Sequence, residues 1–160
     1  MTRTFDAPRK LVWQAWTQRE HLWHWWATKN VTLRVLDVDF REGGALHCCV
    51  RIPDGSEIWS RWIYREIHVP ERIVFVNSFS DEAGKVVRRP NAPDWPLEML
   101  TAFAFSEHAG KTTLTMRATA LNATERERKA FIAGHAGMLQ GWTETLDRLA
   151  AYLVSPSKQA

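Results

Sequence analysis

The sequence predicts an α+β fold in which a curved antiparallel sheet of six to seven strands wraps around one long C-terminal helix. Short runs with a period of two in their apolar residues follow one another from residue 31 to 120, separated by tight turns. A helical apolar pattern of about 30 residues comes next, long enough at roughly 1.5 Å per residue to cross a small domain. Two short helical patterns precede the strands. Burying one face of each element requires the sheet to curl around the long helix.

Two short helices open the chain after a first strand of a few residues. Asp6 predicts the first helix start as a capping carboxylate, and Pro8 is suited to the first turn. Apolar residues then recur at helical spacing to about residue 17. A second short helix carries Leu22, Trp25 and Trp26. We expect these helices to close one end of the domain.

The strands are predicted from alternation and from turn residues. We expect them at about 31–40, 45–52, 56–68, 72–80, 97–107 and 111–120. The parity of the apolar residues changes near residues 35–36, which predicts a bulge or a sharp bend. Residues 81–96 contain three prolines and are expected to form a long polar loop.

The long helix begins at a capping box formed by Thr124 and Glu127. Its apolar stripe consists of Phe131, His135, Met138, Leu139, Trp142, Leu146, Leu149 and Leu153. Gly134, Gly137 and Gly141 lie beside the stripe, although each costs about 1 kcal/mol relative to alanine. They either allow close packing against a neighbouring element, or thin the helix face to leave room for a ligand or for flexing. We predict one domain over residues 1–154 and a polar tail over 155–160.

Composition narrows the classes of function. The net charge of +3 is spread along the chain without a basic block, so we expect no nucleic-acid partner. There is no apolar stretch of 18 residues and no signal peptide, so we expect no membrane association. The adjacent Cys48 and Cys49 could form only a strained disulfide. Free thiols without an export signal predict a cytoplasmic protein.

The chain contains nine tryptophans among its 160 residues. Trp has a large apolar surface, so this number indicates either an unusually aromatic core or a cavity for a flat apolar ligand. Trp13, Trp16, Trp25 and Trp26 are expected to hold the short helices against the sheet. The residues predicted to line a ligand cavity, each with plain core packing as the alternative, are Trp62, Tyr64, Phe75, Phe103, Met116, Met138 and Trp142.

Signatures of catalysis and of metal binding are missing from the sequence. It has no nucleophile elbow, no phosphate-binding glycine loop and no His-Glu-x-x-His motif. His21 and His24 could share a metal, and so could the run His47 to Cys49, but neither set has a partner that completes it. We therefore predict no metal and no cofactor.

Two polar residues are candidates for acid–base chemistry. Glu66 alternates with Trp62 and Tyr64; if that face points inward, burial would raise the pKa of Glu66 and make it a general acid or base. The alternative is an ion pair with an arginine of a neighbouring strand. His135 lies within the apolar stripe and is either a hydrogen-bonded core residue or a polar group that faces the cavity and orients a ligand.

Several stretches resemble a known family. The chain resembles the heat-shock-protein ATPase-activator homologue (AHSA-like) family in the opening run 3–17, in the run 20–26 and in the later runs 41–44, 64–75 and 137–149. That family belongs to the SRPBCC superfamily, which has the START and birch-pollen-allergen helix-grip fold. The resemblance spans nearly the whole chain and implies the same fold that the periodicity predicts.

The resemblance also bears on function. It implies an apolar ligand between the sheet and the long helix, and some relatives are cyclases, dehydratases or hydrolases. The position of Trp62 is often glycine in relatives. An inward Trp62 would make the cavity smaller and flatter, whereas an outward one would be a surface ring that needs a partner.

We predict a protein that binds a small apolar molecule, aromatic or polycyclic, without catalysis. One alternative is a cyclase, dehydratase or hydrolase that uses Glu66 or His135. Another is a stress-response module that regulates a chaperone ATPase; the activators carry a further region that this sequence lacks, which argues against that role. Homodimerisation through a sheet edge or an exposed Trp is left open.

Overall fold

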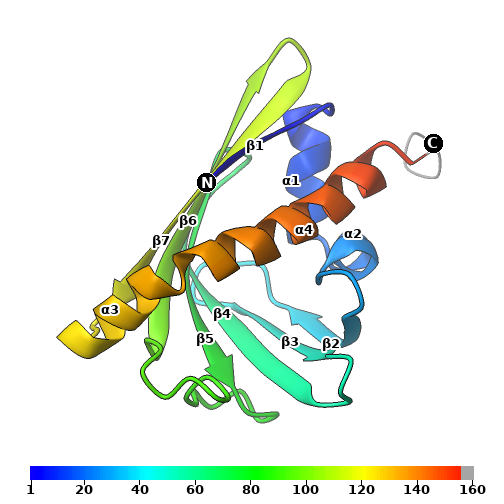
Figure 1. The fold of residues 1–160 in the computed structure, drawn as a ribbon. Coiled ribbons are helices and arrows are strands. Elements are labelled where there is room, and N and C mark those ends of the chain that lie inside the picture. The colour runs from blue at the N-terminus through cyan, green and yellow to red at the C-terminus, as the bar shows by residue number, and fades with distance from the viewer. Residues whose placement is uncertain (156–160) are drawn as a thin grey trace.

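The computed structural model describes residues 1–155, which form one antiparallel sheet and four helices (Figure 1). The elements are β1 (Thr2–Phe5), α1 (Arg9–Thr17), α2 (Arg19–Trp25), β2 (Thr32–Val38), β3 (Ala45–Arg51), β4 (Glu57–His68), β5 (Arg72–Ser80), β6 (Glu98–His108), β7 (Lys111–Leu121), α3 (Glu125–Ala133) and α4 (His135–Leu153). The predicted fold class is confirmed. Of the predicted polar tail, residues 156–160 lie outside the described part of the chain.

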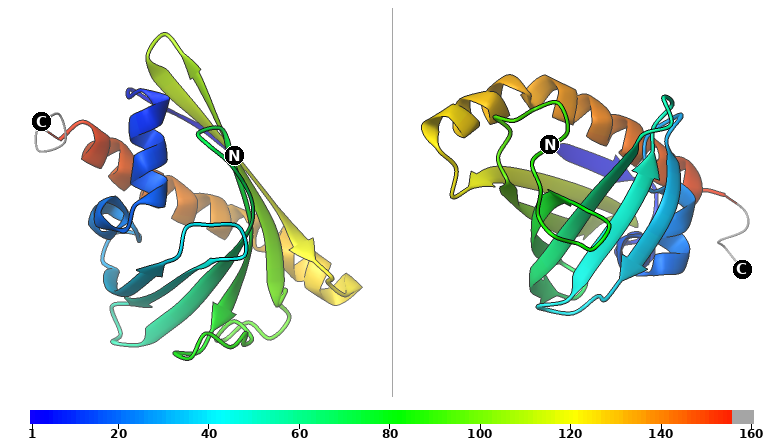
Figure 2. Two further views of the ribbon diagram at one scale, coloured as in Figure 1. Left: turned by 180° about the vertical axis from the view of Figure 1, so that it is seen from behind. Right: turned by 90° about the horizontal axis from the view of Figure 1, so that it is seen from below.

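The sheet has the strand order β1-β7-β6-β5-β4-β3-β2, with every neighbouring pair antiparallel. It curls beneath α4, and α1 and α2 lie beside the C-terminal half of that helix (Figure 2). All six predicted strands are present. The predicted irregularity is a register shift between Leu33 and Val35, slightly before the expected position. Among residues 1–155, no helix combines the length and the apolar character needed to cross a bilayer.

The start of α1 differs from the prediction. Pro8 is the N-cap and has no capping side chain. Asp6 lies too early to reach the first helical N–H groups and instead pairs with Lys111 at 3.6 Å. The backbone N–H of Arg9 donates to Glu107 Oε2 over 2.6 Å, so a carboxylate from the end of β6 satisfies the first turn.

The long C-terminal helix is interrupted at Gly134, which separates α3 from α4. The ring of Trp95, from the 81–97 loop, lies against this glycine, and a Cβ there would come within 2.5 Å of Trp95 Cζ3. Close packing therefore explains Gly134. By contrast, a Cβ at Gly137 or Gly141 would meet no atom within 4 Å, so these two glycines thin the face of α4.

The 81–97 loop is attached to α3 by charge and by ring contacts. Arg88 forms a short ion pair with Glu127, whose carboxylate also completes the predicted capping box with Thr124. The guanidinium of Arg89 lies 4.7 Å from the centroid of the Trp95 ring. These contacts hold the loop over the beginning of the C-terminal helices.

The core is aromatic and continuous. Trp62 points inward, is 6% exposed and stacks on Phe75 with ring centroids 3.9 Å apart. Trp16 contacts both Trp25 and Phe103, at 4.7 and 4.6 Å between centroids. Of the four tryptophans predicted to hold the short helices against the sheet, Trp13, Trp16 and Trp26 contact rings of the sheet directly, whereas Trp25 packs on Trp16 and Trp26.

Candidate functional site

Two cavities lie between α4 and the concave face of the sheet. The first, which we call the β7-side cavity, has a volume of about 380 Å³ and is lined by Met1, Thr101, Met116, Arg117, Ala118, Thr119, Phe131, His135, Met138, Leu139 and Trp142. The second, the β3-side cavity, has a volume of about 370 Å³ and is lined by Trp26, Ala27, Thr28, Val31, Cys48, Val50, Ile52, Ser60, Met138, Gly141, Trp142 and Thr145. Both volumes are in the range of ligand-binding pockets.

Met138 and Trp142 line both cavities. They are four residues apart on α4 and therefore project from the same face of the helix. Trp142 is anchored on the aromatic core, with ring centroids 5.9 Å from Phe103 and 6.1 Å from Trp26. These two side chains form the partition between the cavities.

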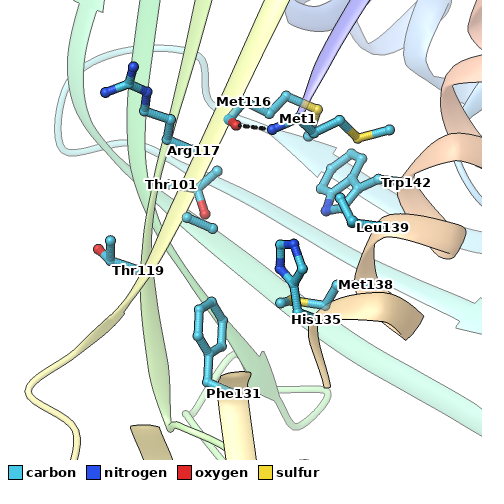
Figure 3. Close-up of a pocket in the computed structure, with 11 residues that line it drawn as sticks. Met1, Thr101, Met116, Arg117, Thr119, Phe131, His135, Met138, Leu139 and Trp142 are labelled. Carbon is cyan, nitrogen blue, oxygen red and sulfur yellow. Dashed lines mark hydrogen bonds between the residues drawn. The ribbon is translucent and has the colours of Figure 1, made fainter. Parts of the chain in front are cut away.

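Figure 3 shows how side chains point into the β7-side cavity. His135 and Trp142 enter from α4, and Phe131 forms the wall below them. The side chains of Arg117 and Thr119, which flank the lining residue Ala118 on β7, point away from the cavity. The wall is therefore mostly apolar.

The polar side chains in the β7-side cavity are few. Thr101 Oγ1 donates to Asn77 Oδ1 over 2.7 Å. Among the described residues, neither the imidazole of His135 nor the indole N–H of Trp142 has a hydrogen-bond partner.

The β3-side cavity has a different chemistry. Cys48 Sγ lies 3.2 Å from Ser60 Oγ, and burial raises the pKa of the Cys48 thiol. The thiol is therefore neutral, a weak nucleophile and a weak hydrogen-bonding group. Gly141 opens the opposite wall, because it places no side chain into the space.

The predicted ligand-lining residues divide into two groups. Met116, Met138 and Trp142 line the β7-side cavity. The other four do not line either cavity, because their rings pack against one another and against Phe40 in the core; these are Trp62, Tyr64, Phe75 and Phe103. The ring of Trp62 points inward and therefore fills part of the core instead of lining a cavity.

The two acid–base candidates also separate. The strand register shifts between Tyr64 and Glu66, so Glu66 no longer shares the inward face of Tyr64. Glu66 is exposed and lies 3.4 Å from Arg72, which is the ion-pair alternative. His135 is exposed to the β7-side cavity instead of being hydrogen-bonded in the core.

The potential metal-binding histidines have other partners. His21 Nδ1 lies 2.7 Å from the Tyr152 hydroxyl, and His24 stacks on the Tyr152 ring. His47 Nε2 lies 3.2 Å from Ser80 Oγ. Within residues 1–155, no three His, Cys, Asp or Glu side chains come together as a metal site.

Sequence reasoning missed several cavity residues. Thr101, Ala118, Ser60 and Cys48 point inward from strands, but small or polar residues at inward positions look like solvent-facing ones when only the sequence is known. Phe131 belongs to the apolar stripe that the sequence shows, so its position was accessible from the helical period.

A curved sheet that holds a C-terminal helix over two cavities defines a helix-grip protein. The chain belongs to the family described as Activator of Hsp90 ATPase homolog 1-like protein, whose profile matches residues 6–154. No curated protein sequence matches the chain significantly.

Solved structures share the fold over nearly the full chain. Protein Ms6760 from Mycobacterium smegmatis is 25% identical, with a TM-score of 0.77 over 97% of this chain and 88% of its own. A protein from Staphylococcus epidermidis is also 25% identical, with a TM-score of 0.73 over 96% and 87%. The AHSA1 protein of Silicibacter pomeroyi is 17% identical, with a TM-score of 0.69 over 96% and 94%, and shows the fold alone.

Proposed function

We propose that this protein binds a small apolar molecule, aromatic or polycyclic, between the sheet and α4. The observation that carries the proposal is the pair of cavities on the two sides of Met138 and Trp142. Apolar walls with a few polar groups are typical of small-molecule sites. Gly141 supports the proposal, because it lines the β3-side cavity without filling it although glycine there makes the helix less stable than alanine would.

Binding is better supported than catalysis. His135 is the one ionisable side chain that the described structure directs into the β7-side cavity, and Glu66 lies on the surface. A general acid or base works with a second group that orients it or shares the proton transfer, and no carboxylate lines either cavity. A role as a chaperone-regulating module finds less support, because the large exposed apolar side chains come from five separate segments: Trp23, Val69, Leu97, Ile132 and Val154.

The test is titration with N-phenyl-1-naphthylamine, an uncharged probe whose fluorescence rises in apolar surroundings. Ala118→Phe fills the β7-side cavity, and Gly141→Phe extends into the β3-side cavity, where a Cβ meets open space. We expect at least one of them to weaken probe binding about tenfold, or about 1.4 kcal/mol.

The matched control is Ala104→Phe, which makes the same substitution at an exposed residue of β6 that lines neither cavity. It should leave the affinity unchanged while circular dichroism shows all variants folded. Equal binding by the wild type and both filled variants, or no saturable binding at all, would overturn the proposal.

A further inference from the structure

We propose that the ligand of the β7-side cavity carries an uncharged oxygen, in a hydroxyl or ketone group, that Trp142 and His135 recognise. This inference rests on the proposed function and adds the chemical class of the ligand. It starts from the indole N–H of Trp142, which can only donate a hydrogen bond.

The Trp142 nitrogen differs from the indole nitrogens of Trp25, Trp16 and Trp95. Trp25 Nε1 donates to the Ala15 carbonyl over 3.0 Å. The nitrogens of Trp16 and Trp95 have no partner, but they are sealed among neighbouring atoms and line neither cavity. The nitrogen of Trp142 is turned toward the β7-side cavity and toward His135 (Figure 3). A ligand oxygen there would supply the acceptor that indole N–H groups usually find.

His135 and Thr101 add to the same polar region. His135 lies two helical turns before Trp142, so both side chains project from one face of α4 into the cavity. A neutral imidazole has one donor and one acceptor nitrogen, and Thr101 Oγ1, having donated to Asn77, still accepts. A ketone oxygen could accept from Trp142 and His135, and a hydroxyl could also donate.

The directions of the side chains around the cavity favour a neutral group. The guanidinium of Arg117 points away from the cavity, and the amino group of Met1 donates to the Met116 carbonyl over 3.0 Å. The other walls, at Phe131 and Leu139, are apolar. A carboxylate would lose its hydration here without a cationic side chain directed at it, which is costly.

Three probes that share one ring system test the inference: naphthalene, 2-naphthol and 2-naphthoic acid, titrated at pH 7 by isothermal calorimetry. We expect the wild type to bind 2-naphthol about tenfold more tightly than naphthalene, as one or two net hydrogen bonds allow. Trp142→Phe keeps a ring and removes the N–H, so this preference should fall severalfold while naphthalene affinity changes little.

Two further variants serve as a second test of the polar contacts and as a control. His135→Leu replaces an exposed residue and leaves the core rings in place, so it should reduce the preference without unfolding the chain. Trp23→Phe, at an exposed Trp on α2, is the control and should leave every affinity unchanged.

The outcomes separate the two proposals. If none of the probes binds, the proposed function fails and this inference fails with it. If naphthalene and 2-naphthol bind equally, or Trp142→Phe and His135→Leu leave the preference intact, apolar binding stands and the oxygen recognition is overturned. Tightest binding of 2-naphthoic acid would also overturn it, because the site would then favour an anion.

Discussion

Replacing Gly134 with alanine adds a methyl group where the chain bends between α3 and α4. The new Cβ would lie 2.5 Å from Trp95 Cζ3 and 3.1 Å from Cη2, well inside ordinary contact distance. Trp95 is 5% exposed. The guanidinium carbon of Arg89 lies 4.7 Å from the centroid of its ring, and the ring centroid of Phe131 lies 5.6 Å from it. The ring cannot move aside without disturbing the loop that covers α3.

The magnitude follows from these contacts. Overpacking of this kind costs about 1–3 kcal/mol. Gly141→Ala is the matched substitution in the interior of α4, where the Cβ meets no atom within 4 Å and alanine should stabilise the helix by about 0.5–1 kcal/mol. The two variants should therefore differ by about 1.5–4 kcal/mol in the free energy of unfolding.

Urea denaturation followed by circular dichroism measures this difference. Each 1 kcal/mol should also shift the melting temperature by about 2–4 °C in a chain of this size. Combining Gly134→Ala with Trp95→Leu should restore part of the loss, because the smaller side chain makes room for the methyl group. A Gly134→Ala protein as stable as wild type, or a destabilised Gly141→Ala protein, would refute the packing argument.

Two other predictions concern stability. Hydrogen bonds from Arg88 and Thr124 lower the pKa of Glu127 to about 2, so its contribution is present above the ordinary pKa of about 4.3 and is lost as the pH falls toward 2. Urea denaturation at pH 2–6 should show a shallower acid loss for Glu127→Gln, and an identical pH profile would contradict this. Trp62→Ala should cost about 3–5 kcal/mol because it removes the ring stacked on Phe75; a loss below about 1 kcal/mol would show that the core adapts.

Local signals in the sequence were sufficient for most of the fold. The capping box at Thr124 and Glu127 depends on residues three apart and was read correctly. The cap of α1 was predicted wrongly, because the carboxylate that accepts from Arg9 belongs to Glu107, 98 positions further along the chain. The break at Gly134 was missed for the same reason, since Trp95 approaches it only in the folded chain.

The candidate site was accessible only in part. The helical period placed Met138 and Trp142 on one face, and the structure puts both at the two cavities. The alternation on β4 predicted that Glu66 points inward, but the register shift after Tyr64 places Glu66 on the outer face. Cavities depend on which space neighbours leave empty, so the inward Ala118 gives no signal in the sequence.

The pairing of β1 with β7 has a consequence for how the chain folds during synthesis. Thr2 pairs with Thr115, and the Thr112 hydroxyl donates to the Ala7 carbonyl from 105 positions along the chain. These partners leave the ribosome only after most of the sheet has been made, at about 5–20 residues per second. The strand β1 must therefore wait several seconds or more for its neighbour, and it is fixed in place only after β7 has been made.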